Sequence, residues 1–574
     1  MGHATAPLRD VCGYHCAMIS RAWLIAILAA AAAVSTGVGC AVGAQGRGDA
    51  DSADSAASPG SAADWPAYNR TLAGDRFSPL TQVQTSNVAR LALQCTYELP
   101  EVSSFQTGPI VVAGTMYFTT DQNSYAMDAR TCQLKWTQHR TSARPSRLNV
   151  NRGFAYLDGM LFRGTSDGHV VGLSAADGHQ LWDHRIEVEA PGMSIPMAPI
   201  AFGGRVYVGT AGGDNVGVTG HVFALDAQDG HQIWRFDSVP EGPIRRTWTN
   251  PQLPISGGGF WTSFSYDAAK GILYVPAGNA APDFDTLDRT GEDLYSNSVI
   301  AIDAASGRIL AYRQLVPQDS HDWDVDSAPA LVTTRRGRQI IASANKDGLL
   351  SILDRSDIHV SQQDGAAQGT VPAGTAPLIP LLSQTPTTTR SNVDVPLSRE
   401  HPVHFCPGYN GGTEWNGAAY SPTTDSLFVA AVDRCATVQL EPTLKVPPAG
   451  DLWFAAAKRD FDPISQARGW LTAFNAENGQ IRWKFHAAHP LLAGVTPTAG
   501  RVVFAADLAG VLYALDQRSG KLLWRQETGQ ALGGGIVSYA VDGQQRIAVA
   551  SGMNSPVWPG GAQHSRVLVY GLSP

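Results

Sequence analysis

Hydrophobic and polar residues repeat along the chain in one short pattern. An alternating apolar segment leads into a turn rich in aspartate and glycine, and a second segment follows that usually ends in tryptophan. Copies cover residues 125–136, 171–182, 223–234, 300–311, 472–483 and 513–524, and a degenerate copy surrounds Asp354. Each copy predicts a β-hairpin, because alternation with a period of two indicates a half-buried strand and Asp-Gly, Ser-Gly or Asn-Gly turns tolerate positive φ.

Further strands are predicted before most copies, for example at residues 204–209 and 500–505, and they complete a four-stranded sheet. A single sheet cannot bury both of its faces, whereas radial stacking of many sheets can. The sequence therefore predicts an all-β protein, a β-propeller with eight blades rather than seven. The recurring tryptophans are expected between neighbouring blades, and strands around Trp65 and residues 567–572 are expected to close the ring.

Two long insertions interrupt the repeat, one after Trp234 and one after Asp354. Insertions in a repeat fold emerge as loops on one face and often build the site. The loops at residues 282–291 and 369–389 are expected to shape its mouth. The Gly-His and Trp-Asp signatures of WD40 repeats are missing at the corresponding places, which disfavours that class of propeller.

Composition agrees with a turn-rich globular protein. Of 574 residues, 16% are charged and 44% are hydrophobic, with 59 glycines and 35 prolines, which excludes a coiled coil or a disordered chain. The net charge of -8 leaves no basic face for phosphate groups, so nucleic acid is excluded as a partner.

The N-terminus predicts export. Arg21 precedes an apolar run at residues 22–34, which is short for a membrane span and suits a secretory signal. We assign residues 1–43 to the signal peptide, 44–64 to a flexible linker and 65–574 to the propeller. Gly39-Cys40 resembles a lipoprotein cleavage site, and a cut before Ala44 is the alternative. The expected location is the periplasm or another extracytoplasmic site. A lipid anchor at Cys40 is expected if the lipoprotein cleavage site is used.

Seven cysteines are present, and Cys95, Cys132, Cys406 and Cys435 fall in the folded part. The simplest pairing joins Cys95 to Cys132 and Cys406 to Cys435, although four cysteines permit three connectivities and four buried thiols are the alternative. The sequence contains no Cys-x-x-Cys-His haem motif. Any electron acceptor is therefore expected to be another molecule.

Several loop motifs together resemble those of the pyrroloquinoline-quinone (PQQ) alcohol dehydrogenases. The resemblance spans about the whole chain after the linker and rests on the repeat and on motifs at residues 65–69, 76–80, 87–91, 151–155, 258–261, 278–282, 321–326, 344–348, 411–416 and 533–552. It implies an eight-bladed propeller that binds PQQ together with Ca²⁺ or a lanthanide ion.

The resemblance also implies roles for individual residues. Trp261 would stack on the quinone, Lys346 would bind its oxygens, and Trp415 and Asn416 would line the cofactor from a later blade. The alternatives are structural: Trp261 would be a core tryptophan, Lys346 a surface lysine, and Trp415 and Asn416 ordinary strand residues.

Two further residues would carry the metal and the chemistry. Asn279 would bind the metal through its side-chain oxygen, and Asp324 would be both metal ligand and general base for the alcohol proton. The alternatives are that Asn279 caps a loop and that Asp324 is an ordinary turn residue.

Three departures from the family pattern are visible. Asn215 stands where family enzymes have a metal-binding glutamate, with Asp214 beside it and Thr219 in place of a cofactor-contacting arginine. Asp326, two residues after Asp324, is associated in this family with lanthanide sites, and we expect it to restore the missing charge.

The third departure concerns the face of the quinone opposite Trp261. Ser146 and Arg147 replace the vicinal cysteine pair that covers this face in many members. Arg147 is expected to stack there through its guanidinium plane.

The leading hypothesis is an exported PQQ-dependent dehydrogenase that oxidises an alcohol or polyol to a carbonyl. It would pass electrons to a separate carrier such as a cytochrome c or a quinone. The alternative is a non-catalytic propeller scaffold that resembles the outer-membrane assembly lipoprotein BamB, and a degenerate enzyme that binds cofactor without turnover is a third reading. The sequence does not identify the substrate or the oligomeric state.

Overall fold

The computed structural model describes residues 61–144, 148–186, 191–360, 376–558 and 564–573, all of which belong to the compact unit Ser52–Pro574. Over these residues the only helical segments are the short 3₁₀ turns η2 (Val88–Arg90), η3 (Arg245–Thr247) and η4 (Ile464–Gln466). No helix in the described part has the length and apolar character needed to cross a bilayer. The predicted signal peptide, Cys40 and linker residues 44–60 lie outside the described residues.

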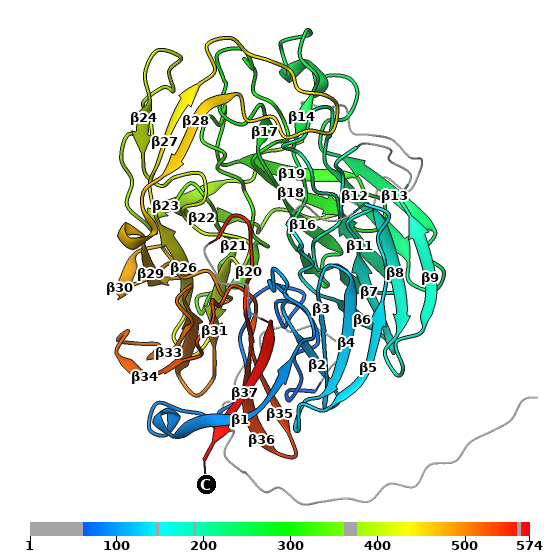
Figure 1. Ribbon diagram of the computed structural model, residues 1–574, viewed down its shortest axis with the longest axis vertical. Helices are drawn as coiled ribbons and strands as arrows, with labels where there is room; N and C mark the ends of the chain where they lie inside the picture. Colours follow the sequence, from blue (N-terminus) through cyan, green and yellow to red (C-terminus); the bar gives the residue numbers. More distant parts are fainter. Residues whose placement is uncertain (1–60, 145–147, 187–190, 361–375, 559–563, 574) are drawn as a thin grey trace, which may run out of the picture. The chain divides into compact units, whose positions relative to one another are not determined.

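The described strands form eight four-stranded antiparallel sheets, which we number as blades 1–8 (Figure 1). Blade 1 contains β2 (Ile110–Val112), β3 (Thr115–Thr119), β4 (Asn123–Asp128) and β5 (Leu134–His139). Blade 2 contains β6 (Ala155–Leu157), β7 (Met160–Gly164), β8 (His169–Ser174) and β9 (Gln180–Arg185). Blade 3 contains β10 (Ile200–Phe202), β11 (Arg205–Gly209), β12 (His221–Asp226) and β13 (Gln232–Asp237). Blade 4 contains β15 (Ser265–Asp267), β16 (Ile272–Ala277), β18 (Ser298–Asp303) and β19 (Ile309–Gln314).

The second half of the chain repeats this plan. Blade 5 contains β20 (Ala330–Thr333), β21 (Gln339–Ala344), β22 (Leu349–Asp354) and β23 (Leu381–Pro386). Blade 6 contains β25 (Ala418–Ser421), β26 (Ser426–Asp433), β29 (Arg468–Asn475) and β30 (Ile481–Ala487). Blade 7 contains β31 (Thr496–Pro497), β32 (Val502–Ala506), β33 (Val511–Asp516) and β34 (Leu522–Glu527). Blade 8 contains β35 (Ile536–Val541), β36 (Gln544–Ser551), β37 (Arg566–Leu572) and the N-terminal strand β1 (Leu91–Glu98).

Hydrophobic cores join each blade to the next one around a closed ring. Separate buried clusters connect blades 1 and 2, blades 2 to 4, blades 4 and 5, blades 5 and 6, blades 6 and 7, blades 7 and 8, and finally blades 8 and 1. The fourth strand of a blade is its most exposed one, as the alternating burial of β5 and β9 shows. This closed stacking is the predicted β-propeller, in which sheets bury both faces against their neighbours.

The repeated tryptophan lies at the seam between blades. The Trp182 indole N–H donates to the backbone oxygen of Ala227 at 3.0 Å, and the ring packs on the turn of the next blade at Gly230. Gly230 has φ +78°, and a Cβ at this position would lie only 2.6 Å from the Trp182 ring. The pattern of aspartate, glycine and tryptophan is therefore one interlocking unit shared by two blades. The same contact recurs for Trp136 with Ala175, Trp234 with Ala304 and Trp483 with Gln517.

Ring closure agrees with the prediction at residues 567–572, which lie in β37, but differs from it at the N-terminal end. Trp65 contributes only an isolated bridge to Val111, and β1 pairs with β37 in register from Leu91 opposite Leu572 to Glu98 opposite Arg566. Figure 1 shows β1 beside the C-terminal strand. The closing strand was missed because β1 is not a copy of the repeat.

Both predicted disulfides are present. Cys95 on β1 bonds to Cys132 in the β4–β5 turn, which ties the closing strand to blade 1. Cys406 bonds to Cys435, next to an additional three-stranded sheet of β24 (Val403–Phe405), β27 (Ala436–Leu440) and β28 (Ala456–Phe461). A small two-stranded sheet pairs β14 (Ser256–Gly257), which precedes blade 4 in the sequence, with β17 (Ala280–Ala281), which lies between β16 and β18 of blade 4.

Candidate functional site

Loops from several blades bring the motif residues together. Trp261 follows β14, Asn279 connects β16 to β17, Asp324 lies between β19 and β20, and Lys346 lies in the β21–β22 turn. Trp415 precedes β25 of blade 6. Residues that are far apart in the sequence meet because the corresponding loops of neighbouring blades emerge close together.

Asp324 occupies the centre of this cluster. Its Oδ1 accepts the backbone N–H of Asn279 at 2.8 Å, and its Oδ2 lies 2.6 Å from Lys346 Nζ. The residue is only 4% exposed. A Cβ at Gly278 would overlap Asp324 Oδ1, so the glycine of the Gly-Asn motif leaves room for the carboxylate.

Lys346 connects Asp324 to a second aspartate. Its Nζ also donates to Asp322 Oδ1 at 3.3 Å. Burial alone would lower the pKa of Lys346, but Asp322, Asp324 and other nearby carboxylates raise it well above its ordinary value. The lysine is therefore a permanent cation within a set of buried acids.

The side chain of Asn279 faces two carboxylates that the motif comparison had not assigned. Its Nδ2 donates to Asp283 Oδ1 at 3.1 Å, and it also hydrogen-bonds Asp214. Burial and the nearby Asp324 charge raise the pKa of Asp214 to about 6. Burial and the charge of Asp214 raise the pKa of Asp283 well above its usual range.

Asn215 lies differently from the expected metal ligand. Its Nδ2 donates to the backbone oxygen of Gly192 at 3.1 Å, and its backbone forms a bridge with Leu452. It is Asp214, rather than Asn215, that contacts Asn279. The role of Asn215 in metal binding stays a prediction.

Asp326 and Glu414 form another acidic group on the same lysine. Burial, followed by the charge of Glu414, raises the pKa of Asp326 well above its usual range. Burial raises the pKa of Glu414 to about 7, although Lys346 counteracts this. Neither oxygen of Asp326 has a hydrogen-bond partner in another described residue. Asp326 is thus a buried acid that interacts electrostatically with Glu414, Lys346 and Asp324, and its role in metal binding stays a prediction.

Trp261 and Trp415 form the aromatic part of the site, with an arginine close to both rings. The Arg152 guanidinium carbon lies 4.8 Å from the ring centroid of Trp261 and 5.0 Å from that of Trp415. Lys346 Nζ lies 5.8 Å from the Trp261 ring. Burial lowers the pKa of Arg152 to about 10, so it remains a cation at neutral pH. Two cations thus adjoin the flat face of Trp261.

Asn416 is used within the protein. Its Nδ2 donates to the backbone oxygen of Leu492 at 2.8 Å, and its Oδ1 accepts the hydroxyl of Tyr68 at 3.1 Å. Its side chain therefore braces the loop that carries Trp415, while its contact with a cofactor stays a prediction.

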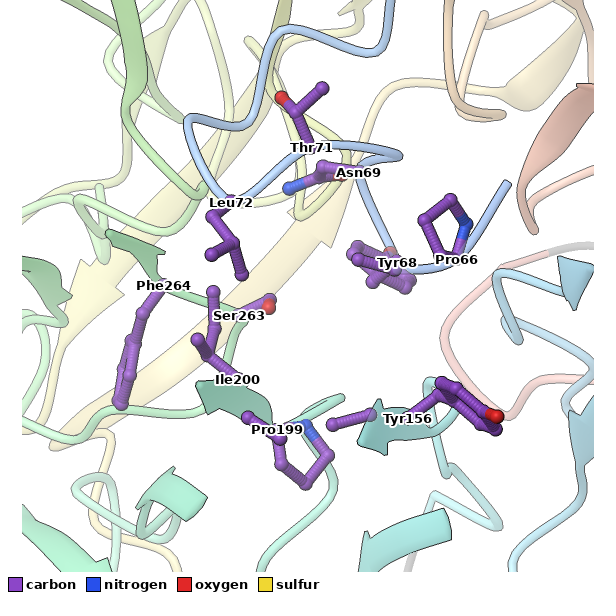
Figure 2. A pocket seen from close by; sticks show the side chains of 13 residues that line it. Pro66, Tyr68, Asn69, Thr71, Leu72, Tyr156, Pro199, Ile200, Ser263 and Phe264 are labelled. Carbon is purple, nitrogen blue, oxygen red and sulfur yellow. The ribbon is translucent and has the colours of Figure 1, made fainter. Parts of the chain in front are cut away.

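Tyr68 also lines a small pocket with residues such as Leu72 and Phe264 (Figure 2). Its volume of about 20 Å³ suits a water molecule rather than a cofactor or an alcohol.

The three-stranded sheet and its connecting loop cover the acidic loops. Phe405 of β24 and Val438 of β27 pack with Trp323 and Phe284, which lie beside Asp324 and Asp283 in sequence. The backbone N–H of Trp453 donates to the backbone oxygen of Asp214. Residues 282–291 therefore lie partly beneath this cover.

The second segment expected at the mouth is largely a strand rather than a loop, although Thr387 and Thr388 contact Gly348 in the β21–β22 turn that carries Lys346. Within residues 369–389, β23 is the fourth strand of blade 5 and pairs only with β22. Residues 369–375 are outside the described part of the chain. Instead, the cover comes from the insertion that carries β24, β27 and β28, which sequence reasoning did not separate from blade 6.

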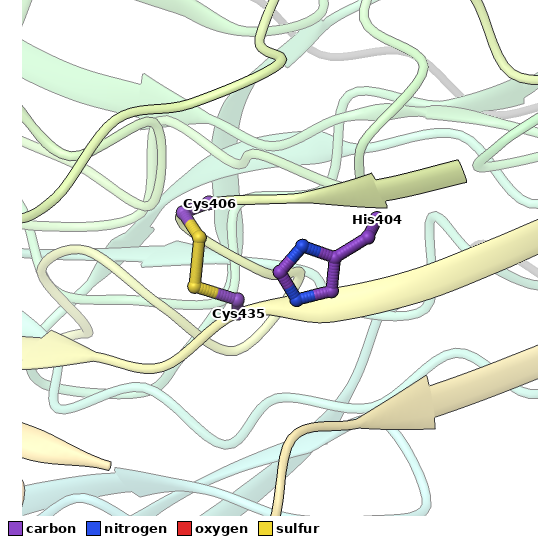
Figure 3. A group of neighbouring side chains, drawn as sticks. All are labelled: His404, Cys406 and Cys435. Atoms are coloured by element: carbon purple, nitrogen blue, oxygen red, sulfur yellow. A yellow bond between two sulfur atoms is a disulfide. The ribbon is translucent and has the colours of Figure 1, made fainter. Parts of the chain in front are cut away.

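His404, Cys406 and Cys435 gather at the end of this cover (Figure 3). The two sulfur atoms are joined in the disulfide, so they offer no thiolates to a metal ion. This group therefore has a structural role, in contrast to the oxygen-rich cluster around Asn279.

Sequence reasoning missed Arg152, Asp283 and Glu414. Arg152 and Glu414 lie inside motifs at residues 151–155 and 411–416 that the sequence had singled out, so only their roles were missed. Asp283 directly follows the Gly-Asn motif and had no such signal. Arg147 and Ser146 lie outside the described residues, and stacking by Arg147 stays a prediction.

Comparison with protein families gives two matches. Residues 65–359 match the model described as "Glucose/ethanol/alcohol dehydrogenase, beta-propeller domain". Residues 467–557 match the model for outer membrane protein assembly factor BamB. The first match contains the loops of Trp261, Asn279, Asp324 and Lys346, whereas the second covers parts of blades 6–8.

Individual relatives agree with the first match. The chain is 28% identical to the quinohemoprotein alcohol dehydrogenase of Comamonas testosteroni, over 96% of this chain and 80% of the relative. It is 27% identical to the lanthanide-dependent methanol dehydrogenase of Methylacidiphilum fumariolicum, over 85% of this chain and 84% of that enzyme.

Solved structures show the same fold. The quinohemoprotein alcohol dehydrogenase ADHIIG from Pseudomonas putida superimposes with a TM-score of 0.77 at 25% identity, over 89% of this chain and 80% of that one. The enzyme from Comamonas testosteroni gives a TM-score of 0.75 at 26% identity, with the same coverage.

Proposed function

The chain belongs to the glucose/ethanol/alcohol dehydrogenase β-propeller family, and from this premise we propose that it oxidises an alcohol or polyol to a carbonyl with Asp324 as the general base. It is an oxidoreductase of the PQQ alcohol dehydrogenase type. The cofactors of this type are PQQ and a Ca²⁺ or lanthanide ion.

The arrangement of Asp324 is the observation that carries the proposal. Its carboxylate is held from both sides, by the backbone N–H of Asn279 and by Lys346, and it is almost fully buried. A fixed carboxylate next to a permanent cation suits proton removal, because the position and charge of the base are set before substrate arrives.

The residues fit a flat, anionic quinone. PQQ is planar and carries three carboxylates, and the site offers the face of Trp261 together with the cations of Arg152 and Lys346. Trp415, whose ring centroid lies 5.0 Å from the Arg152 guanidinium carbon, adds a second aromatic surface. Aromatic faces and buried cations are the groups that recognise such a molecule.

The residues also fit a hard cation. The side chains around Asn279 present oxygen donors, and Asp283 Oδ2 and Asn215 Oδ1 are buried without a hydrogen-bond partner among the described residues. Oxygen-only donors of this kind are preferred by Ca²⁺ and by other hard cations. Asn279 and Asp324 would hold the ion, and Asn215 and Asp326 are the further ligands that the sequence predicts.

When bound, PQQ supplies a hydride acceptor and the metal polarises it. The protein's own residues do the remaining work. Asp324 accepts the hydroxyl proton of the alcohol while the hydride leaves the carbinol carbon. Lys346 pairs with the Asp324 carboxylate and fixes its position for this transfer, and Asp322 holds Lys346 in place. The cover of β24, β27 and β28 excludes water from the acidic loops.

Two finer features belong to the same proposal. Electrons leave for a separate carrier such as a cytochrome c or a quinone, since the sequence has no haem motif. Residues 1–43 direct export to the periplasm, with Cys40 as a candidate lipid anchor. A BamB-like scaffold has weaker support, because that family model covers only residues 467–557 and leaves out the acidic loops.

Reconstitution tests the proposal. The purified chain is titrated with PQQ in the presence of Ca²⁺ or La³⁺, and alcohol-dependent dye reduction is followed. We expect metal-dependent turnover that falls about 10³-fold in Asp324→Ala, since general-base catalysis contributes about 10²–10⁴-fold. Turnover that persists in Asp324→Ala would show that Asp324 is not the general base. Failure to bind PQQ with either ion would refute the proposed dehydrogenase activity.

A further inference from the structure

Residues 63–78, which we call the N-terminal segment, contact the first strand of all eight blades. Each of these strands lies at one edge of its sheet. Blades 2 and 3 meet the segment at the pocket of Figure 2, which Leu72 lines together with Ala155 of β6 and Ile200 of β10. Backbone hydrogen bonds join it to the other six blades through Ala63, Trp65, Leu72, Ala73, Asp75 and Ser78. The segment therefore covers strand edges that would otherwise be open.

Tyr68 links the N-terminal segment to the loop that carries Trp415. The residue is 3% exposed, and its hydroxyl donates to Asn416 Oδ1 at 3.1 Å. The amide of Asn416 in turn donates to the backbone oxygens of Leu492 and Gly533, in the loops before blades 7 and 8. The Tyr68 hydroxyl therefore supplies a donor to a buried amide that joins three loops, and one of these loops continues directly into Trp415.

The ring of Tyr68 packs on the backbone that holds Arg152. A Cβ at Gly108 would lie 2.5 Å from this ring, so the glycine lets the ring lie directly on the main chain. The backbone N–H of Gly108 donates to the backbone oxygen of Arg152 at 2.9 Å. The Arg152 guanidinium carbon lies 5.0 Å from the centroid of the Trp415 ring. Tyr68 therefore reaches both partners of this contact, Trp415 through its hydroxyl and Arg152 through its ring.

Tyr68 is itself fixed by other residues of the N-terminal segment. The guanidinium carbon of Arg76 lies 5.8 Å from the centroid of the Tyr68 ring. Arg76 is fully buried and donates to the backbone oxygen of Val495 at 3.0 Å and to the side-chain oxygen of Asn69. The Trp65 indole N–H donates to the backbone oxygen of Tyr68 at 3.4 Å. The protein therefore sets the position of Tyr68 without help from a ligand.

We propose that Tyr68 is a positioning residue of the site, which aligns Trp415 and Arg152 for the flat, anionic cofactor. The inference rests on the proposed function, in which these two side chains adjoin PQQ. It also gives a role to the sequence motifs at residues 65–69 and 76–80, to which the family resemblance assigned none. Without the tyrosine hydroxyl, the buried oxygen of Asn416 loses its donor and the loop relaxes in the free protein. Binding must then restore the alignment, which lowers the affinity.

A binding measurement tests this role. The purified chain is titrated with PQQ in the presence of Ca²⁺ or La³⁺, and bound cofactor is measured by equilibrium dialysis. We expect Tyr68→Phe to raise the Kd by about 10-fold, since loss of one partner of a buried polar group changes an equilibrium constant by roughly this factor.

Tyr117→Phe is the matched control for this measurement. It also removes a buried tyrosine hydrogen bond, from Tyr117 to the backbone oxygen of Ala175, but at the seam between blades 1 and 2. We expect it to change the Kd by less than about twofold. Denaturant melts verify that both variants fold.

Hydrogen exchange in the cofactor-free protein tests the cause of the lower affinity. The backbone N–H groups of Gly412 and Thr413 donate to the backbone oxygens of Val432 and Asn345, just before Trp415. In Tyr68→Phe we expect these amides to exchange about 10-fold faster than in the wild type, while amides at the blade seams keep their rates. Tyr117→Phe should leave the amides of Gly412 and Thr413 unchanged.

Three results would overturn the role of Tyr68. The first is wild-type affinity for PQQ in Tyr68→Phe, and the second is faster exchange throughout the protein. The third is an equal loss of affinity in Ser78→Ala, which removes a hydrogen bond to Ser538 from the same N-terminal segment. The second and third results would assign the effect to the stability of the segment as a whole.

Failure of this inference is distinct from failure of the proposed function. Wild-type protein that binds PQQ and reduces dye with alcohol, together with unchanged affinity in Tyr68→Phe, refutes only the positioning role. Wild-type protein that binds no PQQ with either ion refutes both the dehydrogenase and the role of Tyr68 toward its cofactor.

Discussion

The seams between blades and the cluster around Lys346 differ in how their buried polar groups are paired. At the seam of blades 2 and 3, Trp182 fills its contact surface and its indole N–H has a partner in Ala227. Around Lys346, carboxylates crowd together and several of their oxygens have no partner among the described residues. The seam is organised for stability, whereas the cluster keeps buried charge that only a ligand can balance.

The largest expected effect comes from removing the cation that holds the cluster together. Lys346→Met leaves Asp322 and Asp324 without their shared partner, and we expect the free energy of unfolding to fall by about 3–5 kcal/mol. Turnover should be lost as well. Chemical denaturation and dye reduction measure the two effects.

A double variant sharpens this prediction. Adding Asp322→Asn to Lys346→Met removes one of the orphaned charges, so part of the stability should return while turnover stays absent. If the double variant regained turnover, Lys346 would have a structural role alone.

A smaller effect is expected at the seam. Trp182→Ala should lower the free energy of unfolding by about 3 kcal/mol, the lower end for a buried tryptophan because this ring is 8% exposed. The rate of turnover per folded molecule should not change, since the seam lies away from the cluster.

Trp524 is the matched control for this comparison. It occupies the same position of the repeat in blade 7 but is only partly buried, against Tyr570 of blade 8. Trp524→Ala should cost less than half as much as Trp182→Ala in a thermal or denaturant melt. An equal cost would mean that burial at the seam does not determine its strength.

The smallest effect concerns pH and Asp347, the neighbour of Lys346 in the turn. Burial raises the pKa of Asp347 from 3.8 to about 7. Because the pKa is higher in the folded state, Asp347 stabilises the protein most below pH 4, and this contribution disappears as the pH rises through 7. The free energy of unfolding can change by at most about 1.4 kcal/mol per pH unit, which is the value for a difference of one bound proton.

Asp347→Asn should flatten this part of the stability profile, as measured by denaturant melts between pH 4 and 8. Asp177→Asn is the control, because Asp177 is an exposed turn residue whose pKa is lowered to about 2 by its hydrogen bonds. An unchanged profile in Asp347→Asn would assign the pH dependence to other buried acids.

The sequence predicted the seams better than the site. The repeat encodes both partners of each seam, since Trp182 and the turn at Gly230 occupy fixed places in successive copies. The closing strand was missed because residues 91–98 lack this pattern and pair only with the far end of the chain.

For the site, the motifs located Trp261, Asn279, Asp324 and Lys346 but not all of their neighbours. The contact of Asn279 with Asp283 depends on the path of a loop, which no periodicity encodes. The position of Arg152 against Trp261 and Trp415 could not be predicted, because these tryptophans lie in different blades and meet only in the folded protein.

The pairing of β1 with β37 also sets an order of events during folding. β1 leaves the ribosome early and exposes an unpaired edge until the last strand of the chain exists. Oxidation of Cys95 and Cys132 needs only β1 and blade 1, so the bond can hold the waiting strand beside the place where the ring will close. A chain that ends before β37 would keep this open edge permanently and would be prone to edge-to-edge aggregation.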